Sequence, residues 1–130
     1  MAMILTAMAL SVLASASAHA ICTQADGAGT WRAFITAGSD ADISWLRCTM
    51  RLNSSGVVGA NSFCFRNNGT KVFATAGQVT IASSCAVSGS FTLAGLVKNI
   101  VDGQLSQDKT IMAGVGKDND GSFTFTALKK

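Results

Sequence analysis

The sequence predicts one all-β domain, an antiparallel β-barrel or closed sandwich of about eight strands held by two disulfides. Residues typical of turns recur along the chain at spacings of roughly 8 to 14 residues, as they do in sandwiches and barrels. The segments between them are rich in Val, Ile, Thr and Phe, which favour strands. No segment keeps an apolar stripe at helical spacing for three turns, so almost no helix is expected beyond the N-terminal segment.

Residues 1–20 are predicted to be a secretory signal peptide. A long apolar run is followed by small residues and ends in Ala18-His19-Ala20, which matches the A-x-A cleavage pattern. The alternative is a membrane anchor, but the apolar run is shorter than the roughly 20 residues that a spanning helix needs. The alanine-rich segment is typical of bacteria. We therefore expect a protein secreted to the periplasm or the cell exterior, in which residues 21–130 form one domain without a membrane span.

The cysteines all lie in residues 21–130, and they are Cys22, Cys48, Cys64 and Cys85. An even number of cysteines in a small secreted chain predicts two disulfides. Zinc is the alternative, but no C-x-x-C spacing supports it, so no metal site is expected. Of the three possible pairings we favour Cys48–Cys64, which would join neighbouring strands. Cys22–Cys85 would then tie the N-terminal arm to the domain.

The strand pattern is clearest in residues 44–52, SWLRCTMRL. One face carries Leu46, Cys48, Met50 and Leu52, and the other carries Trp45, Arg47, Thr49 and Arg51. This alternation predicts a half-buried strand. Residues 122–130 alternate in the same way. The other expected strands are 30–36, 62–66, 70–75, 78–82, 89–94, 97–105 and 110–117, and Gly77, Gly89 and Gly103 are interpreted as turn signals.

Charge and residue types limit the chemistry. The chain has ten Lys and Arg and seven acids, giving a net charge of +3, which is too small to indicate nucleic acid as a partner. The one histidine, His19, lies in the predicted signal peptide, and residues 21–130 contain no His, Glu or Tyr. A Ser-His-Asp or Cys-His nucleophile and a His-ligated catalytic metal are therefore excluded. We expect no catalytic residues and no cofactor.

A calcium site is conceivable at residues 117–121, KDNDG, because closely spaced carboxylates before a glycine can surround a hard cation. The spacing of an EF-hand is not met, since upstream ligand positions are missing and no Glu closes the loop. The favoured interpretation is a tight hairpin turn at Asn119-Asp120-Gly121.

The stripe of Trp45, Arg47, Thr49 and Arg51 is the main binding candidate. Trp and Arg offer large contact areas and forked hydrogen-bond donors, and they anchor many interfaces. Single-stranded nucleic acid also uses this pairing, but a secreted protein is not expected to bind it. The alternative is an ordinary solvent face on which arginine stems cover a Trp ring.

The segment Gly29-Thr30-Trp31 resembles the Gly-x-Trp that opens the first strand of lipocalins and avidins. The resemblance implies a barrel in which Trp31 plugs one end and a basic residue packs across its ring. It covers three residues, and the further Trp and Tyr residues of avidin ligand sites are missing here. Trp31 and the adjacent Arg32 are a second, smaller set of binding candidates.

These observations favour a non-catalytic secreted β-module that binds a macromolecule or cell-surface component. One alternative is a structural subunit of an extracellular filament or surface layer. The chain has few charged residues and no proline, and these are the residues that keep strand edges from pairing with another copy. A second alternative is a small-ligand-binding barrel. The partner is unknown on any of these hypotheses, and the filament would pair the chain with itself.

Overall fold

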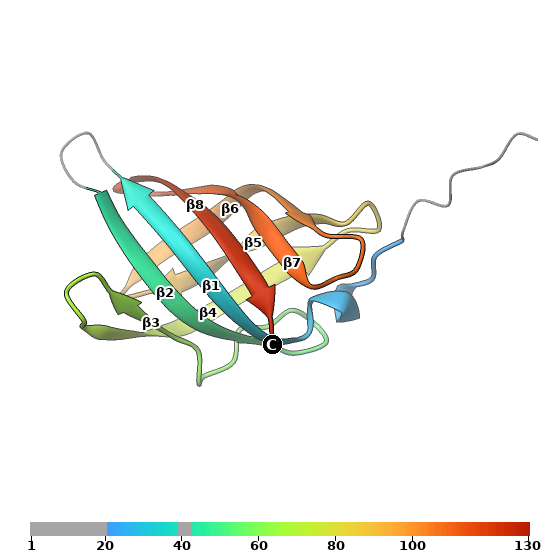
Figure 1. The fold of residues 1–130 in the computed structure, drawn as a ribbon, viewed down its shortest axis with the longest axis horizontal. Helices are drawn as coiled ribbons and strands as arrows, with labels where there is room; N and C mark the ends of the chain where they lie inside the picture. The colour runs from blue at the N-terminus through green and yellow to red at the C-terminus, as the bar shows by residue number, and fades with distance from the viewer. Residues whose placement is uncertain (1–20, 39–42) are drawn as a thin grey trace, which may run out of the picture.

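The structure is a computed structural model that describes residues 21–38 and 43–130, and the predicted signal peptide lies outside these residues. Eight antiparallel strands close into a barrel, in which each strand pairs with the next in sequence and β8 pairs with β1 (Figure 1). The predicted all-β class is confirmed, in its barrel form. The elements are the 3-10 helix η1 (Gln24–Gly27) and the strands β1 (Gly29–Gly38), β2 (Ile43–Leu52), β3 (Phe63–Arg66), β4 (Lys71–Ile81), β5 (Ala86–Leu93), β6 (Leu96–Leu105), β7 (Ile111–Asp118) and β8 (Gly121–Lys129).

Alternation of side chains along the strands fills the barrel with apolar groups. In β2 the inward residues are Leu46, Cys48, Met50 and Leu52, all buried, as their alternation predicts. In β8, Phe123 and Ala127 are buried, whereas the intervening Thr124 and Thr126 are exposed. The core thus runs along the barrel axis, with Trp31, Phe123 and Leu105 among its most completely buried side chains.

Both favoured disulfides are confirmed. Cys48 and Cys64 are register partners in the β2–β3 pairing and form one bond, with a Cα–Cα distance of 3.9 Å. Cys22 and Cys85 form the other and join the N-terminal arm to the β4–β5 connection. No free cysteine is found among the residues that the structure describes.

The interpretation of Gly77 as a turn is wrong, because the two strands expected around it are one strand, β4. Gly77 has a φ of 145°, and a Cβ there would lie 2.6 Å from the Cα of Phe91 on β5. The residue is therefore a glycine because the neighbouring backbone approaches closely, with a register shift between Ala74 and Ala76 beside it. Gly89 and Gly103 likewise lie within strands, β5 and β6, and do not form turns.

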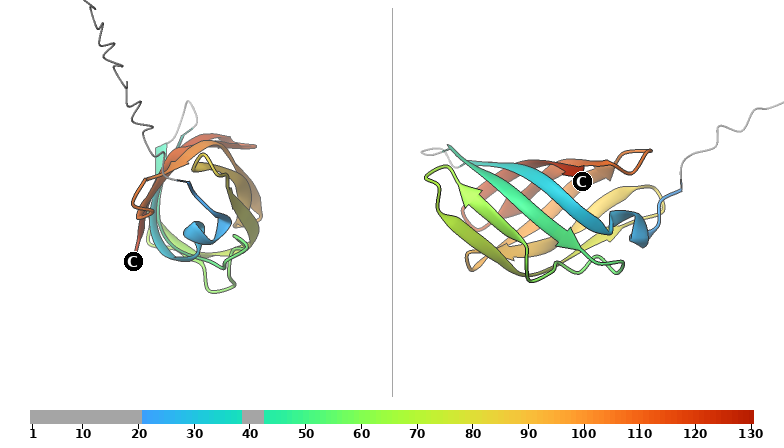
Figure 2. Two further views of the ribbon diagram at one scale, coloured as in Figure 1. Left: turned by 90° about the vertical axis from the view of Figure 1, so that its right-hand side faces the viewer. Right: turned by 60° about the horizontal axis from the view of Figure 1, so that its bottom comes forward.

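The two ends of the barrel differ. At one end, called the plugged end here, η1 lies across the ring of strands in the end-on view of Figure 2. The opposite end, called the mouth, is formed by the β3–β4, β5–β6 and β7–β8 turns with the adjoining ends of β1 and β2.

Trp31 fixes the plugged end, as the Gly-x-Trp resemblance implies. Its side chain is 1 % exposed, and its Nε1 donates a 2.9 Å hydrogen bond to the carbonyl oxygen of Gly27 in η1. Lys129 Nζ lies 5.3 Å from the centroid of the Trp31 ring and donates to the carbonyl oxygen of Asp26. A basic residue from the last strand thus packs across the tryptophan of the first.

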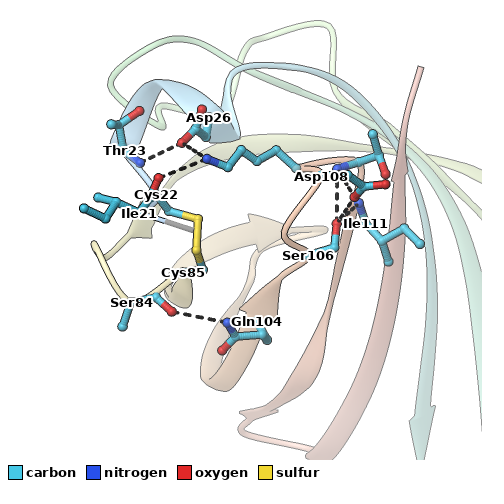
Figure 3. Close-up of a disulfide and its surroundings, with 12 residues drawn as sticks. Ile21, Cys22, Thr23, Asp26, Ser84, Cys85, Gln104, Ser106, Asp108 and Ile111 are labelled. Carbon is cyan, nitrogen blue, oxygen red and sulfur yellow. Dashed lines mark hydrogen bonds and ion pairs between the residues drawn. A yellow bond between two sulfur atoms is a disulfide. The ribbon is translucent and has the colours of Figure 1, made fainter. Parts of the chain in front are cut away.

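The N-terminal arm is tied to the plugged end at several further points (Figure 3). Asp26 Oδ2 accepts a hydrogen bond from the backbone N–H of Thr23 at 2.7 Å, next to the Cys22–Cys85 disulfide. Lys109 Nζ reaches the same carboxylate at 3.2 Å and the carbonyl oxygen of Ile21 at 3.0 Å. The arm is therefore held by a covalent bond, an ion pair and hydrogen bonds. Within residues 21–38 and 43–130, no helix has the length and apolar character that crossing a membrane requires.

Candidate functional site

A cavity of about 590 Å³ lies at the mouth of the barrel. Small-molecule sites in proteins commonly enclose roughly 300–1,000 Å³, so this volume is large enough for a ligand. Its larger apolar lining residues are Trp45, Leu46, Leu93 and Leu96. Its polar lining residues are Ser44, Arg66, Asn67, Asn68, Lys98, Asp118, Asp120 and Ser122. The wall therefore combines a few apolar side chains with many hydrogen-bonding groups.

A buried ion pair lies in the wall of this cavity. Lys98 Nζ is 2.5 Å from Asp118 Oδ2, and the two side chains are only 6 % and 5 % exposed. Lys98 belongs to the inward-facing residues of β6, and Asp118 ends β7. The ammonium also lies 5.4 Å from the ring centroid of Phe123. The pair places one donor group and one acceptor group together where the core meets the mouth.

The charge of Asp118 is held by its neighbours. Burial of its side chain alone would raise the pKa of Asp118, but several contacts of the charged form outweigh burial. These are the hydrogen bond and charge of Lys98 and the backbone N–H groups of Asp120 and Gly121, which together hold the pKa below its ordinary value. The N–H of Asp120 donates to Asp118 Oδ1 at 2.9 Å. The carboxyl group of Asp118 is therefore ionised at neutral pH.

Acid should weaken the fold through this pair. Because the pKa of Asp118 is lower in the folded chain than its ordinary value of 3.8, the unfolded chain binds the proton more readily. The stabilisation is present above pH 3.8 and is lost as the pH falls through the lower folded pKa. Urea unfolding at a series of pH values should show a falling free energy below pH 3.8, with a shallower fall in the double variant Lys98→Met/Asp118→Leu.

A residual fall in that double variant is expected, because hydrogen bonds also lower the pKa of two further carboxyl groups, those of Asp26 and Asp108. For Asp26 the backbone N–H of Thr23 contributes most, followed by Lys109, and for Asp108 the hydroxyl of Ser106 contributes most. If the free energy of unfolding falls equally steeply below pH 3.8 in the parent and the double variant, Asp118 contributes nothing to the acid sensitivity.

A second feature is the outer face of β1 to β4, where aromatic and basic side chains gather. We call it the aromatic–cationic face, and it consists of Arg32 and Phe34 on β1, Trp45, Arg47 and Arg51 on β2, Phe63 and Phe65 on β3, and Lys71 and Phe73 on β4. Phe34, Trp45 and Phe73 are 47 %, 52 % and 53 % exposed. Large exposed apolar groups that lie together on a surface indicate a binding site more often than single ones do.

The residues predicted from the sequence as binding candidates fall in two places. Trp45, Arg47, Arg51 and Arg32 lie on the outer face, as their alternation predicts, and Trp45 also lines the mouth cavity. Trp31 lies inside the barrel at the plugged end and lines a separate apolar cavity of about 50 Å³. The structure therefore brings four of the five together and separates Trp31 from them.

Two sets of residues were not among the predicted candidates. Lys98 and Asp118 form the buried pair, and the signal for Lys98 was its place between Leu96 and Ile100 in an otherwise apolar inward register. The four phenylalanines of the outer face were the other set. Their signal was the alternation of Phe63 and Phe65 around the buried Cys64.

The KDNDG segment forms the expected β7–β8 hairpin turn, with Asp118 and Gly121 as the last register pair. Asp118 faces Lys98 in the ion pair. Across the described part of the chain, no group of three or more His, Cys, Asp or Glu side chains is placed to hold a metal ion.

Comparisons with known proteins bear on the fold. No protein-family model and no curated protein matches the chain. Among solved structures, a redesigned β-barrel is similar, with 20 % identity and a TM-score of 0.58 over 82 % of this chain and 94 % of that one. Likeness at this identity shows the closed barrel alone and names neither lipocalins nor avidins.

Proposed function

We propose that this protein is a non-catalytic binding protein that holds a small polar ligand in the mouth cavity of its barrel. The Lys98–Asp118 pair in the cavity wall carries this proposal. A buried ion pair is a weak source of stability, because apolar side chains of similar volume often serve as well or better. A pair that apolar side chains could replace without loss of stability, but that faces a cavity of about 590 Å³, fits a role in recognition.

The charges around the cavity narrow the class of ligand. Lys98 and Arg66 are balanced by Asp118 and Asp120 among the described lining residues. An anion would meet the two carboxylates, and a cation would meet the two basic groups. The best match is a molecule without net charge that carries both donors and acceptors, such as a polyol, sugar or amide, with an apolar part against Leu93 and Leu96.

We propose binding without catalysis because residues 21–130 lack several residue types that commonly act as nucleophiles or general bases. Residues 21–130 contain no His, Glu or Tyr, and the cysteines form disulfides. The groups at the cavity are an ammonium, two carboxylates, a guanidinium, amides and hydroxyls. Lys98 and Asp118 neutralise one another, which suits hydrogen bonding to a ligand more than proton transfer.

A thermal-shift screen tests this function. Uncharged sugars, polyols and amides are compared with carboxylate and amine analogues of the same size. A true ligand at 100 times its Kd should raise the free energy of unfolding by about 2.7 kcal/mol. The variant Lys98→Met/Asp118→Leu should lose that shift, because it removes both polar partners while keeping the bulk of the side chains.

The matched control is Lys117→Met/Asp102→Leu, which makes the same two replacements at exposed positions on β7 and β6. It should bind the ligand as the parent protein does. Equal binding by the parent and the cavity variant would remove the ion pair from the site. A screen in which only charged analogues bind would contradict the proposed class of ligand.

A second candidate function is binding of a macromolecule or cell-surface component at the aromatic–cationic face. The gathering of three half-exposed aromatic rings with basic residues on adjacent strands supports it. The filament hypothesis gains no such support. It needs a strand edge open to another chain, whereas every strand here has two hydrogen-bonded neighbours, so strand exchange would require the barrel to open.

A further inference from the structure

Rings and cations alternate in a row across the aromatic–cationic face. Phe34 on β1 is the register partner of Arg47 on β2, Arg47 is that of Phe65 on β3, and Phe65 is that of Lys71 on β4. Neighbouring strands are about 4.8 Å apart, so this row extends over about 14 Å. The adjacent row runs from Arg32 through Thr49 to Phe63 and Phe73. The face therefore alternates rings and positive charges along one row and adds two rings and a cation in the next.

The rings and cations also contact each other directly. The guanidinium of Arg47 lies 5.6 Å from the centroid of Phe65, and Lys71 Nζ lies 4.2 Å from Phe63 and 5.1 Å from Phe73. These cation–π contacts hold the basic groups close to the ring faces. A partner that reaches the rings meets the charges at the same time.

The strands that form the face carry basic residues and no acidic ones. Strands β1 to β4 contain no Asp or Glu, whereas Arg32, Arg47, Arg51 and Lys71 point outward from them. The +3 net charge of the whole chain hides this local excess, because acids lie elsewhere, for example on β6 and β7. Charge complementarity therefore requires an anionic partner.

We propose that the aromatic–cationic face binds an anionic polysaccharide. This inference rests on the second candidate function above and names its partner. A sugar ring offers an apolar face of C–H groups for stacking on Phe34, Trp45 or Phe73. A uronate, phosphate or sulfate group accepts hydrogen bonds from Arg47, Arg51 or Lys71. A chain of charged sugars repeats these two features, as the face repeats rings and cations.

Two other anionic partners fit the face less well. A lipid surface is flat, whereas this face is the convex side of a barrel, so only a few of its rings would reach the lipid together. Single-stranded nucleic acid also alternates stacking groups and anions. The two disulfides, however, are consistent with an oxidising environment outside the cytosol, and a protein there is not expected to meet single-stranded nucleic acid.

Titration calorimetry of residues 21–130 tests the proposal with three probes: polygalacturonate, neutral dextran, and an oligothymidylate of similar charge. We expect binding of polygalacturonate that weakens as NaCl is added, and no binding of dextran. Arg47→Gln/Lys71→Gln and Phe34→Ala/Phe73→Ala should each weaken it about tenfold. The mouth-cavity variant Lys98→Met/Asp118→Leu should bind polygalacturonate normally, which separates this site from the cavity.

The controls make equal changes on other parts of the surface. Lys117→Gln/Lys130→Gln removes two exposed charges, and Val101→Ala/Val115→Ala trims two exposed apolar side chains on β6 and β7. Both should bind as the parent does, and thermal unfolding checks that each variant is folded.

Equal weakening by face and control variants would overturn the site. Tighter binding of oligothymidylate at the same residues would overturn the polysaccharide but keep the face as a binding surface. If the protein binds neither polygalacturonate nor oligothymidylate, both the polysaccharide and the face as a binding surface are overturned.

Discussion

Replacing Trp31 with Ala should lower the free energy of unfolding by about 3–5 kcal/mol, the usual range for a buried Trp or Phe. The side chain is 1 % exposed and holds three segments together. Its Nε1 bonds to the carbonyl oxygen of Gly27 in η1, and Lys129 of β8 packs over its ring. Urea unfolding followed by circular dichroism measures the change.

Trp45→Ala is the matched control, because it removes the same side chain from an exposed position. Its effect on the free energy of unfolding should be within about 0.5 kcal/mol, as for most surface substitutions. Trp31→Phe keeps most of the apolar volume and removes only the Nε1 hydrogen bond, so it should fall between the two. If Trp31→Ala and Trp45→Ala cost the same, Trp31 does not plug the barrel.

Replacing Lys98 alone with Met should cost about 3–5 kcal/mol, because it leaves the carboxylate of Asp118 buried without its cation. Replacing both residues, as Lys98→Met/Asp118→Leu, should restore the parent stability or exceed it by about 1–4 kcal/mol. The reason is that two ions no longer have to be transferred from water to the cavity wall. Chemical unfolding of the parent, the single variant and the double variant measures both differences.

Lys117→Met controls for the change of side chain, since Lys117 is exposed on β7 and should tolerate it. A double variant that is stable but does not bind the ligand would show that the pair serves recognition at the expense of stability. A double variant as unstable as the single one would instead make the pair a structural part of the fold, and the main argument for the cavity as a ligand site would fail.

Much of the fold could be predicted because the strands show a local alternation of apolar and polar residues. From Leu46 to Leu52, strand β2 alternates apolar and polar residues, so its inward and outward faces follow from period two alone. The pairing of Cys48 with Cys64 follows once both lie on neighbouring strands. Closure into a barrel does not follow, because it depends on β1 meeting β8, a contact that no local pattern records.

Prediction from local sequence failed at the glycines that lie within strands. Gly77 and Gly89 look like turns in a sequence, yet they lie within the paired strands β4 and β5, opposite Phe91 and Val79 respectively. Each has a positive φ and lies close to the neighbouring backbone. A Cβ on Gly89 would lie 2.1 Å from the carbonyl oxygen of Gln78. What selects glycine here is a neighbour that is distant in sequence, and a single sequence does not show it.

The candidate sites were predictable only in part for the same reason. Trp45 and Arg47 share one strand, so their common face could be inferred. Phe34, Phe65 and Lys71 join that face through the register of three strand pairings. Lys98 and Asp118 come from different strands and meet inside the barrel, so neither could be assigned to the other before the strand order was known.

The closed ring of strands has a consequence for the order in which the chain acquires its structure. Seven of the eight strand pairings join sequence neighbours and can form as successive hairpins. The eighth, between β1 and β8, can form only after β8 is present. The bond from Lys129 Nζ to Asp26 bridges 103 residues, so this step carries the largest entropic cost of loop closure and should limit the folding rate. Until synthesis reaches β8, the edges of β1 and β7 remain open to another copy of the chain. A truncated product would therefore tend to exchange strands with its neighbours, and only the last strand ends that exposure.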